Sequence, residues 1–463
     1  MRKEFKIGTS IESETEYFAT EKIYNIYQKD TVKLSDDRYI VLRGKTTPEF
    51  DAFIVIKDKK NVTLDFGGAT IVLHGKIQPF LIDNSENITI KNCKITYERP
   101  PFTEFTIIEA HPDCMKLKLN DICTCRIEDG KLIPYADTWE NTQLNYRGMF
   151  FQVFDAATGK GYGLHLGAVG DSFIKDPTFP FDIDTYTVKK DGEFIVLNGH
   201  VPEFYKSGRK LVIAHEARNL SNVFMIDCKD ISIKNYRILS SFGMGMYSFR
   251  THNITIDGLK LMYDKESPCV VCNAADAIHT FGTTGKFDIK NCIIGGMIDD
   301  AINIHSNFHT VDHVCGKELY TNLASCEVEV RNLYKPGDKI VVYNGPTLEK
   351  SAEYVIEKVE NIDDNMNKFI LDRPAQEHKK GDLIENMSCN CDVTVDNCII
   401  GNANSHSRFQ SRGKFIMSNC ENELEILLSG DASYWFESSP ITDLTIENCK
   451  FKTDKAKISI TSE

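Results

Sequence analysis

The chain has 463 residues, of which 41% are hydrophobic and 26% are charged, and its formal net charge is −13. This composition is typical of folded globular proteins, and the length allows two or three ordinary domains or one large architecture with insertions. The acidic balance argues against nucleic acid or a polyanionic glycan as the partner, because both need basic surfaces.

The N-terminal residues carry basic charges, but no apolar run follows them, so a secretion signal is not expected. The chain has no run of about 18 apolar residues, and a membrane span is therefore not expected. Fifteen cysteines without a leader favour a reducing compartment and free thiols. We therefore expect a cytoplasmic protein. The sequence leaves both a monomer and a homodimer open.

Residues 1–100 are expected to form an N-terminal cap followed by the first coils of a repeat architecture. Within them, residues 14–28 look helical, and Ser13 and Glu16 have the spacing of a capping box. A cap is needed because the end of a repeat array otherwise exposes its apolar core and an unpaired strand edge.

One pattern recurs along the chain: a polar residue, then alternating apolar and polar residues, then Asn-Cys or a near equivalent. The alternation has period two over about five residues, which is typical of a half-buried strand. Most successive copies begin too close together to hold a βαβ unit with its helix, but their spacing suits one coil of a right-handed parallel β-helix. The copies begin at Asn61, Asn87, Asp230, Asn253, Lys286, Asp392, Lys414 and Asp443.

Stacking the coils about 4.8 Å apart would align the Asn-Cys elements in two rows. The expected asparagine ladder, lining one turn, consists of Asn92, Asn235, Asn291, Asn397, Asn419 and Asn448. The expected row of small core side chains consists of Cys93, Cys292, Cys398, Cys420 and Cys449.

We therefore predict an all-β fold, a right-handed parallel β-helix of the pectin-lyase-like type with two inserted small β-barrel or sandwich domains. Short strand candidates in the two gaps of the repeat support the insertions. These candidates are residues 194–197, 210–214, 339–343 and 369–371. The predicted domains are a cap with the first coils (1–100), an inserted barrel-like domain (101–218), central coils (219–312), a second barrel-like domain (313–388) and C-terminal coils (389–463).

Aspartates interrupt two apolar segments of the central coils. Asp299 and Asp300 are adjacent, and like charges in an apolar setting should raise the pKa of one of them. Asp299 belongs to the copy that starts at Lys286, and Asp276 lies further from the start of its own, preceding copy at Asn253. That preceding coil is longer than its shortest neighbours, by about ten surplus residues near 263–272. Without the surplus, Asp276 falls in phase with Asp299, one rung away.

For Asp300 to join them, the chain must bend at the pair, because neighbours on a regular strand face opposite sides. Gly295 and Gly296 make such a bend easier. Two or three facing carboxylates are the minimum for cleaving a glycosidic bond, since a protonated one acts as the acid and an ionised one activates water. The spacing leaves inverting and retaining chemistry open.

Three motifs resemble those of glycoside hydrolase family 110. They are Ala-Asp-Ala-Ile-His at 275–279, Met-Ile-Asp-Asp-Ala-Ile-Asn-Ile-His at 297–305 and Gly-Asp-Ala-Ser-Tyr-Trp-Phe-Glu-Ser at 430–438. That family comprises inverting, metal-independent α-1,3-galactosidases built on a parallel β-helix with barrel domains. The resemblance is best over 253–310 and 392–451, while residues 306–309 and 403–408 depart from the family pattern where the leaving group is expected.

The resemblance implies that Asp299 is the general acid and that Asp276 and Asp300 together orient and deprotonate water. It also implies contacts to the galactose ring from His279, Asn303, His305, Trp435 and Glu437. Trp435 suits stacking on the apolar face of the sugar, and Glu437 suits a bidentate grip on two hydroxyls. Arg250, at the end of an earlier copy, is a further candidate for a substrate contact. No cofactor or metal is expected.

The predicted function is an inverting exo-glycosidase that removes terminal α-1,3-linked galactose from glycans of the Gal-α1,3-Gal or blood-group-B type. The expected partner is this carbohydrate, with no nucleic acid and no membrane. Cys269 and Cys272 lack a partner pair at zinc-finger spacing, and free thiols are expected there. Two alternatives stay open: another β-helix carbohydrate enzyme, such as a polygalacturonase-like hydrolase, and a non-catalytic glycan-binding β-helix.

Overall fold

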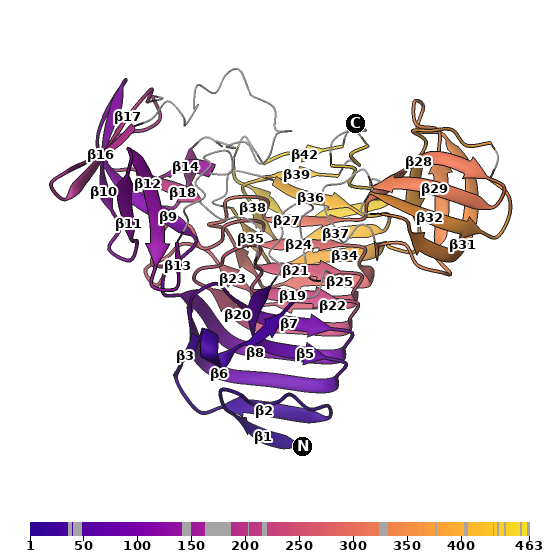
Figure 1. The fold of residues 1–463 in the computed structure, drawn as a ribbon, viewed down its shortest axis with the longest axis horizontal. Helices are drawn as coiled ribbons and strands as arrows, with labels where there is room; N and C mark the ends of the chain where they lie inside the picture. Colours follow the sequence, from indigo (N-terminus) through magenta and orange to yellow (C-terminus); the bar gives the residue numbers. More distant parts are fainter. Residues whose placement is uncertain are drawn as a thin grey trace.

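In the computed structural model, the chain forms a long parallel β-helix with a β-rich lobe on each side (Figure 1). The structure describes residues 1–35, 39, 49–140, 150–162, 187–201, 203–214, 220–323, 332–363, 365–375, 377–401, 406–428, 430–432, 435–438, 441–453 and 456–460. Within these residues every regular element except the short 3-10 turn η1 (Gln28–Asp30) is a strand. The predicted all-β class and the parallel β-helix are confirmed.

The larger sheet contains all the predicted copies of the repeat, and its coils pair in parallel. Its strands are β1 (Arg2–Phe5), β2 (Thr15–Ala19), β3 (Ile23–Tyr27), β6 (Lys60–His74), β8 (Glu86–Tyr97), β20 (Lys229–Ile238), β22 (His252–Asp257), β23 (Lys260–Leu261), β25 (Thr284–Lys290), β26 (Ile293–Ile294), β34 (Cys391–Asp396), β35 (Ile399–Ile400), β37 (Lys414–Ser418), β38 (Glu421–Asn422), β40 (Asp443–Glu447) and β41 (Lys450–Phe451). Because β8 pairs with β20 and β25 pairs with β34, the coils on either side of each insertion are direct neighbours.

The second sheet lies across the core from the first and carries the candidate site. Its strands are β4 (Val32–Leu34), β5 (Phe50–Lys57), β7 (Ile77–Asp83), β19 (Val223–Ile226), β21 (Met246–Phe249), β24 (Ile278–Phe281), β27 (Ile302–His305), β36 (His406–Gln410), β39 (Glu425–Leu427) and β42 (Ile458–Ser459). Between the sheets, apolar side chains stack from rung to rung. One such row is Ile231, Ile254, Phe287, Val393 and Phe415, all buried. Removing this apolar surface from water stabilises the solenoid.

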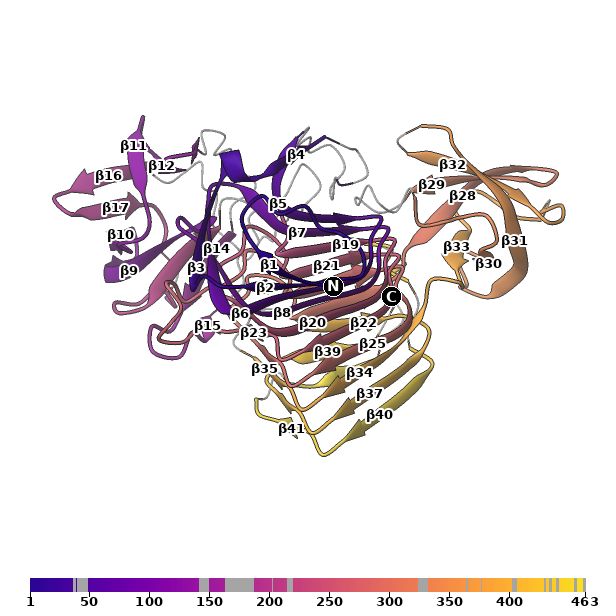
Figure 2. The ribbon, with the colours of Figure 1, turned by 90° about the horizontal axis from the view of Figure 1, so that it is seen from below.

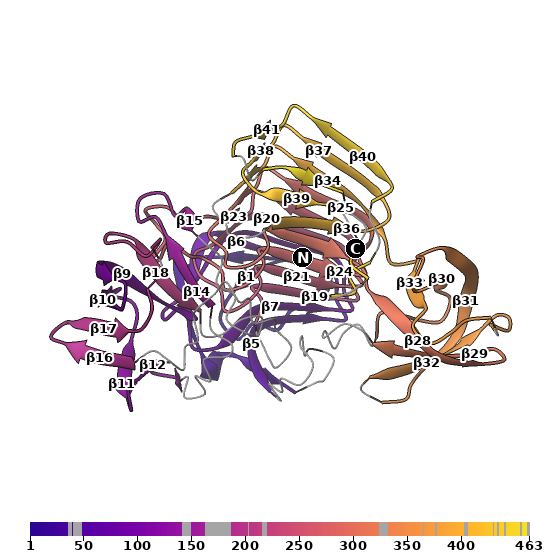
Figure 3. The same cartoon turned by 90° about the horizontal axis from the view of Figure 1, so that it is seen from above.

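Two lobes stand on opposite sides of the solenoid in all three views (Figures 1, 2 and 3). The first contains β9 (Phe102–His111), β10 (Cys114–Leu119), β11 (Cys125–Glu128), β12 (Lys131–Ala136), β13 (Trp139–Glu140), β14 (Phe150–Phe154), β15 (Gly161–Tyr162), β16 (Thr187–Asp191), β17 (Phe194–Asn198) and β18 (Lys210–Ala214). The second is a closed barrel of β28 (Phe308–Cys315), β29 (Glu318–Leu323), β30 (Lys339–Tyr343), β31 (Lys350–Asn361), β32 (Met366–Leu371) and β33 (Leu383–Asn386). The four predicted strand candidates are confirmed.

The asparagine ladder is present. The six predicted asparagines have φ angles of 48° to 59°, the left-handed conformation that Asn tolerates better than most residues. Asn235 donates from Nδ2 to Oδ1 of Asn92 at 3.0 Å, and Asn397 donates likewise to Asn291 at 2.7 Å. Gly258, with a φ of 77°, takes the ladder position in the coil between Asn235 and Asn291.

The cysteines of the repeat lie in the core as predicted. Cys93, Cys292, Cys398 and Cys420 are buried, and Cys449 in the last coil is half-buried. The predicted free thiols at Cys269 and Cys272 are also confirmed.

We expect replacement of Asn397 with alanine to lower the free energy of unfolding by about 1 kcal/mol. The change removes the hydrogen bond to Asn291 and places a Cβ-bearing residue without a polar side chain in the left-handed region. Chemical denaturation measures the loss. Asn397→Gly is the matched control. Glycine tolerates this φ angle, as Gly258 does in its own coil, so this variant should lose clearly less free energy of unfolding. Equal losses in the two variants would contradict a conformational role.

The predicted helix at residues 14–28 is wrong, because this segment forms β2 and β3. The burial of β3 alternates along the strand, with Tyr24 and Ile26 inside, which a strand satisfies and a helix does not. Instead of capping a helix, the hydroxyl of Ser13 accepts a 3.0 Å hydrogen bond from the amide of Lys60. Strands β1 and β2 thus extend the large sheet at this end.

Candidate active site

The predicted acidic residues lie just before two neighbouring strands of the second sheet. Asp276 precedes β24, Asp299 and Asp300 precede β27, and the two strands pair in parallel. The amide of Ala277 donates a 3.0 Å hydrogen bond to the carbonyl oxygen of Asp300, so the two segments are in direct contact. Residues that a full coil separates along the sequence thus meet on adjacent rungs.

The pairing corrects the predicted phase by one residue. Leu261 pairs with Ile294, and Asn273 pairs with Met297, so the long segment 262–273 occupies the same part of its coil as the short segment 295–297. The number of extra residues in the first segment, relative to the second, is therefore one fewer than predicted. A shift of one residue changes which side chain stands opposite. Asp276 is level with Asp300 instead of Asp299.

The predicted bend at the aspartate pair is present. Residues 298–299 form a bend after Gly296, whose φ is 63°. Asp276 and Asp300 are buried, whereas Asp299 is partly exposed. The amide of Asp300 donates a 3.1 Å hydrogen bond to Oδ1 of Asp299. The bend thus places one accessible and one buried carboxylate side by side.

Burial, and after it the repulsion from the Asp299 carboxylate, raise the pKa of Asp276 to about 7. A hydrogen bond from His279 opposes the shift, and Asp300 adds a smaller increase. A carboxyl with a pKa this high exchanges its proton near neutral pH, as acid–base catalysis requires.

This pKa predicts a pH-dependent gain in stability for Asp276→Asn. The folded protein holds a proton on this carboxyl that the unfolded chain releases above about pH 4. The wild type should therefore lose stability as the pH rises from about 4 to 7. At pH 8 we expect the variant to be more stable by about 1–3 kcal/mol, and at pH 5 we expect no gain. Thermal unfolding at both pH values tests this, and a gain of equal size at both would contradict the raised pKa.

Arg408 is a site residue that the sequence analysis missed. It lies on β36 opposite Asn303, and its Nε donates to Oδ2 of Asp300 at 3.0 Å. Burial lowers the pKa of the Arg408 guanidinium, but four carboxylates raise it above its ordinary value. These are Asp300, Glu437, Asp299 and Asp276. Arg408 ends the divergent 403–408 stretch; positions 403–405 of that stretch lie outside the described residues.

Two buried histidines connect Asp276 to Glu437. His279 Nδ1 lies 2.5 Å from Oδ2 of Asp276, and His279 Nε2 lies 3.0 Å from Nε2 of His305. His305 Nε2 in turn lies 3.7 Å from Oε1 of Glu437. The Nδ2 of Asn303 donates to this same Oε1 at 3.2 Å. The candidates His279, Asn303, His305 and Glu437 are therefore brought together with the aspartates.

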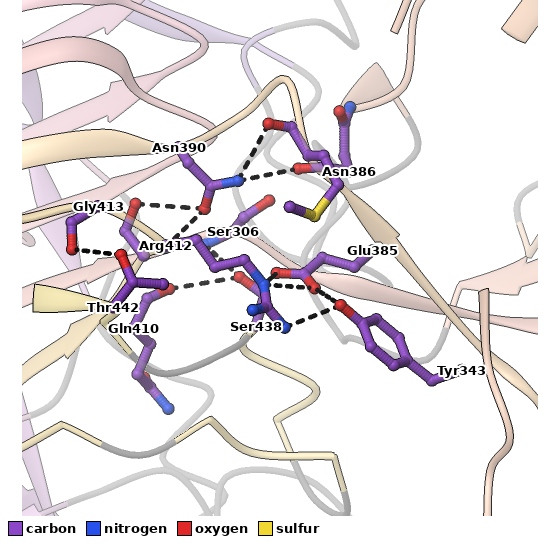
Figure 4. Close-up of polar contacts among 12 residues, drawn as sticks. Ser306, Tyr343, Glu385, Asn386, Asn390, Gln410, Arg412, Gly413, Ser438 and Thr442 are labelled. Carbon is purple, nitrogen blue, oxygen red and sulfur yellow. Dashed lines mark hydrogen bonds and ion pairs between the residues drawn. The ribbon is translucent and has the colours of Figure 1, made fainter. Parts of the chain in front are cut away.

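The segment carrying Glu437 is held by the chain that enters the barrel. Asn307 and Glu437 form an antiparallel bridge, and the amide of Ser438 donates a 2.8 Å hydrogen bond to the carbonyl oxygen of Ser306 (Figure 4). Burial raises the pKa of Glu437, but His305, Arg408, His279 and Asn303 lower it by more, so that the pKa lies below its ordinary value.

The last two candidates differ in their positions. Trp435 is partly exposed, two residues before Glu437, and its amide donates to Oδ2 of Asp431 at 2.5 Å. Arg250 follows β21 and lies beside Gly282, at the end of β24 that is distant from Asp276. Its guanidinium donates to Oδ2 of Asp338 at 3.0 Å. The structure therefore places Arg250 at the junction with the barrel, away from the aspartates.

Within the described residues, no group of three His, Cys, Asp or Glu side chains has a geometry that could hold a metal ion. A search of the same residues for a helix long and apolar enough to cross a bilayer finds none.

Comparison with known proteins gives consistent matches. The chain is 23% identical over 416 residues to α-1,3-galactosidase A of Bacteroides fragilis, and 25% identical over 420 residues to α-1,3-galactosidase B of Bacteroides thetaiotaomicron. Each match covers 86% of this chain and 64% of the relative. A match of 23% identity to α-1,3-galactosidase A of Akkermansia muciniphila covers 86% and 65%. These matches support the assignment of the chain to the α-1,3-galactosidases, glycoside hydrolase family 110.

No protein-family model matches the chain. The chain spans about two thirds of the length of the curated relatives that it matches. The matches agree with the resemblance in the three motifs, and they extend the similarity from about a quarter of the chain to most of it.

Proposed function

We propose that this chain is an inverting exo-glycosidase that hydrolyses terminal α-1,3-linked galactose. The observation that carries the proposal is the meeting of Asp276, Asp299 and Asp300 on adjacent coils. The α-1,3-galactosidase activity for which the relatives are named supplies the substrate class.

In the proposed mechanism, Asp299 is the general acid. It is the most exposed of the three carboxyls, so it can reach the glycosidic oxygen of a bound substrate and protonate the leaving group. Asp300, fixed by its ion pair with Arg408, and Asp276, fixed by His279, orient and deprotonate a water molecule. Attack from the face opposite the leaving oxygen inverts the anomeric carbon.

Two buried oxygens are suited to hold the sugar. Among the residues that the structure describes, Oδ1 of Asn303 and Oε2 of Glu437 have no hydrogen-bond partner, although buried polar atoms normally have one. Galactose hydroxyls would supply the missing partners. Trp435, partly exposed in the same segment as Glu437, is suited to stack on the apolar face of the ring.

The two alternatives fit the site less well. A polygalacturonase-like enzyme acts on an acidic polymer and needs an excess of cations, whereas Arg408 lies among four carboxylates. A non-catalytic β-helix has no need for buried, mutually repelling acids, whose assembly costs stability.

The function is tested by measuring the galactose that the purified protein releases from a panel of substrates. Matched disaccharides with α-1,3, α-1,4 and α-1,6 linkages, an α-1,3-galactoside carrying a branching fucose, and polygalacturonate form the panel. We expect cleavage of α-1,3-galactosides in preference to the other linkages. Release of nothing by folded protein, or cleavage of polygalacturonate alone, would contradict the proposal.

A further inference from the structure

Asp276, His279 and His305 form an unbroken chain of contacts that ends on the backbone. After the contacts of 2.5 Å and 3.0 Å described above, Nδ1 of His305 lies 2.9 Å from the carbonyl oxygen of Ser306. All three side chains are buried, with 1–2% of each residue exposed. Every ring nitrogen of the two histidines therefore has a protein partner, and none is left to receive a sugar hydroxyl.

The contacts fix how many protons the three side chains hold together. A carbonyl oxygen only accepts, so His305 Nδ1 carries a hydrogen. The contact between His279 and His305 needs a hydrogen on one of the two facing Nε2 atoms. The contact between Asp276 and His279 needs one on Oδ2 or on Nδ1. Two neutral imidazoles beside a carboxylate hold one hydrogen too few, because two bare acceptors would then face each other.

Three arrangements satisfy all the contacts, and each has a net charge of zero. The additional proton lies on Asp276 Oδ2, on His279 as a second ring hydrogen, or on His305 as a second ring hydrogen. The arrangements interconvert when hydrogens move along the existing contacts, from Oδ2 to Nδ1 and from Nε2 to Nε2. In these steps no hydrogen leaves the three side chains.

We propose that Asp276, His279 and His305 hold one shared proton, and that its transfer to the histidines keeps Asp276 ionised as the base. The role of Asp276 as a base rests on the proposed function, whereas the number of protons follows from the contacts alone. His279 and His305 are thereby positioning residues that act through Asp276, and not ligands of the sugar.

The surrounding charges explain why Asp276, His279 and His305 keep the shared proton. Asp276 faces Asp299 and Asp300 from the adjacent coil and the positive charge of Arg408 from β36. His305 faces Glu437 at the far end. Asp300 and Glu437 already share Arg408 as a counter-charge, so a further uncompensated negative charge on Asp276 would be costly. A shared proton removes it.

In turnover, Oδ1 of Asp276 takes the reacting proton, since this buried oxygen has no hydrogen-bond partner within the described part of the chain. Water gives its proton to Oδ1 while its oxygen bonds to the anomeric carbon, the bond to the leaving oxygen breaks, and that oxygen takes the proton of Asp299. Asp276 has then gained one proton and Asp299 has lost one. Solvent exchange returns both to their starting states.

The proton count is tested first, without substrate, by nuclear magnetic resonance of protein labelled with ¹⁵N in histidine. At pH 6 we expect His305 to be protonated at Nδ1, one hydrogen between the two Nε2 atoms, and a strongly downfield signal from the hydrogen between Asp276 and His279. The downfield signal should vanish in Asp276→Asn. Two neutral histidines with both Nε2 atoms bare would overturn the proposal.

The second test compares the pH dependence of kcat/KM in His279→Gln and wild type. Glutamine can donate a hydrogen bond but cannot hold the shared proton, so the pKa of Asp276 should rise and the acidic limb should move up by one pH unit or more. A uniform loss of activity with an unmoved limb would mean that His279 has a structural role only, and would overturn the proposal.

His309→Gln is the matched control, because His309 is a buried histidine in the barrel, bonded to Thr321 at 3.0 Å. Its substitution should leave the limb and the downfield signal unchanged. The two proposals fail separately: a shared proton in a protein that cleaves no galactoside contradicts the function alone, and cleavage without a shared proton contradicts this inference alone.

Discussion

Asp299→Asn is expected to lower kcat for Gal-α1,3-Gal by about 10²–10⁴-fold, the usual contribution of a general acid. Asparagine has the same shape, and its Oδ1 can still accept the hydrogen bond from the amide of Asp300, so the fold should be retained. A nitrophenyl α-galactoside should suffer a much smaller loss, because its leaving group needs little protonation. Steady-state kinetics with the two substrates measures the difference.

Asp288→Asn is the control for this variant. Asp288 lies on β25 in the same coil, paired with Lys290 at 3.2 Å on the large sheet, away from β24 and β27. Its substitution should change kcat by less than about twofold, as expected of a surface position. Full activity of Asp299→Asn, or an equal loss on both substrates, would contradict the role of Asp299 as the acid.

Arg412→Met is expected to lower the free energy of unfolding by about 2–4 kcal/mol, because it leaves the fully buried carboxylate of Glu385 without its counter-ion. Arg412 follows β36, and its Nε lies 2.9 Å from both carboxylate oxygens of Glu385 on β33 (Figure 4). Its Nη2 also donates to the hydroxyl of Tyr343 at 2.8 Å. This cluster joins the barrel to the coil that carries Arg408.

Arg373→Met gives the comparison, since Arg373 is an exposed arginine on the same barrel whose partner is Asp372 at 3.2 Å. An exposed pair of this kind contributes about 0–1 kcal/mol. Chemical denaturation followed by fluorescence measures both variants. A loss for Arg412→Met no larger than that for Arg373→Met would show that the buried pair does not stabilise the junction.

The repeat could be predicted because each coil repeats its constraints locally. The alternating strand, the asparagine in the left-handed turn and the small core cysteine all lie within about ten residues of one another, and the periodicity of the copies indicates how they stack. The same locality made the aspartate bend predictable from Gly295 and Gly296. At residues 14–28 the spacing of Ser13 and Glu16 imitates a capping box, whereas the alternation at Tyr24 and Ile26 is that of the strand which the structure shows.

The remaining parts of the site depend on register between distant segments. The copy lengths suggested about ten extra residues in the loop after Leu261, but the pairing leaves one fewer. This difference of one residue places Asp276 opposite Asp300. Arg408 reaches Asp300 only because β36, after the whole barrel insertion, pairs with β27. The contact between the two histidines likewise requires β24 and β27 to be neighbours. No pattern within one coil specifies these pairs.

The anomer of the galactose that is released first gives the most direct test of the acid and base proposed on adjacent coils. Proton nuclear magnetic resonance can follow Gal-α1,3-Gal during the first minutes of hydrolysis, before mutarotation mixes the anomers. The account predicts β-galactose first, with the α-anomer growing in later. Initial release of α-galactose, or no galactose from folded protein, would contradict an inverting centre made by Asp276, Asp299 and Asp300.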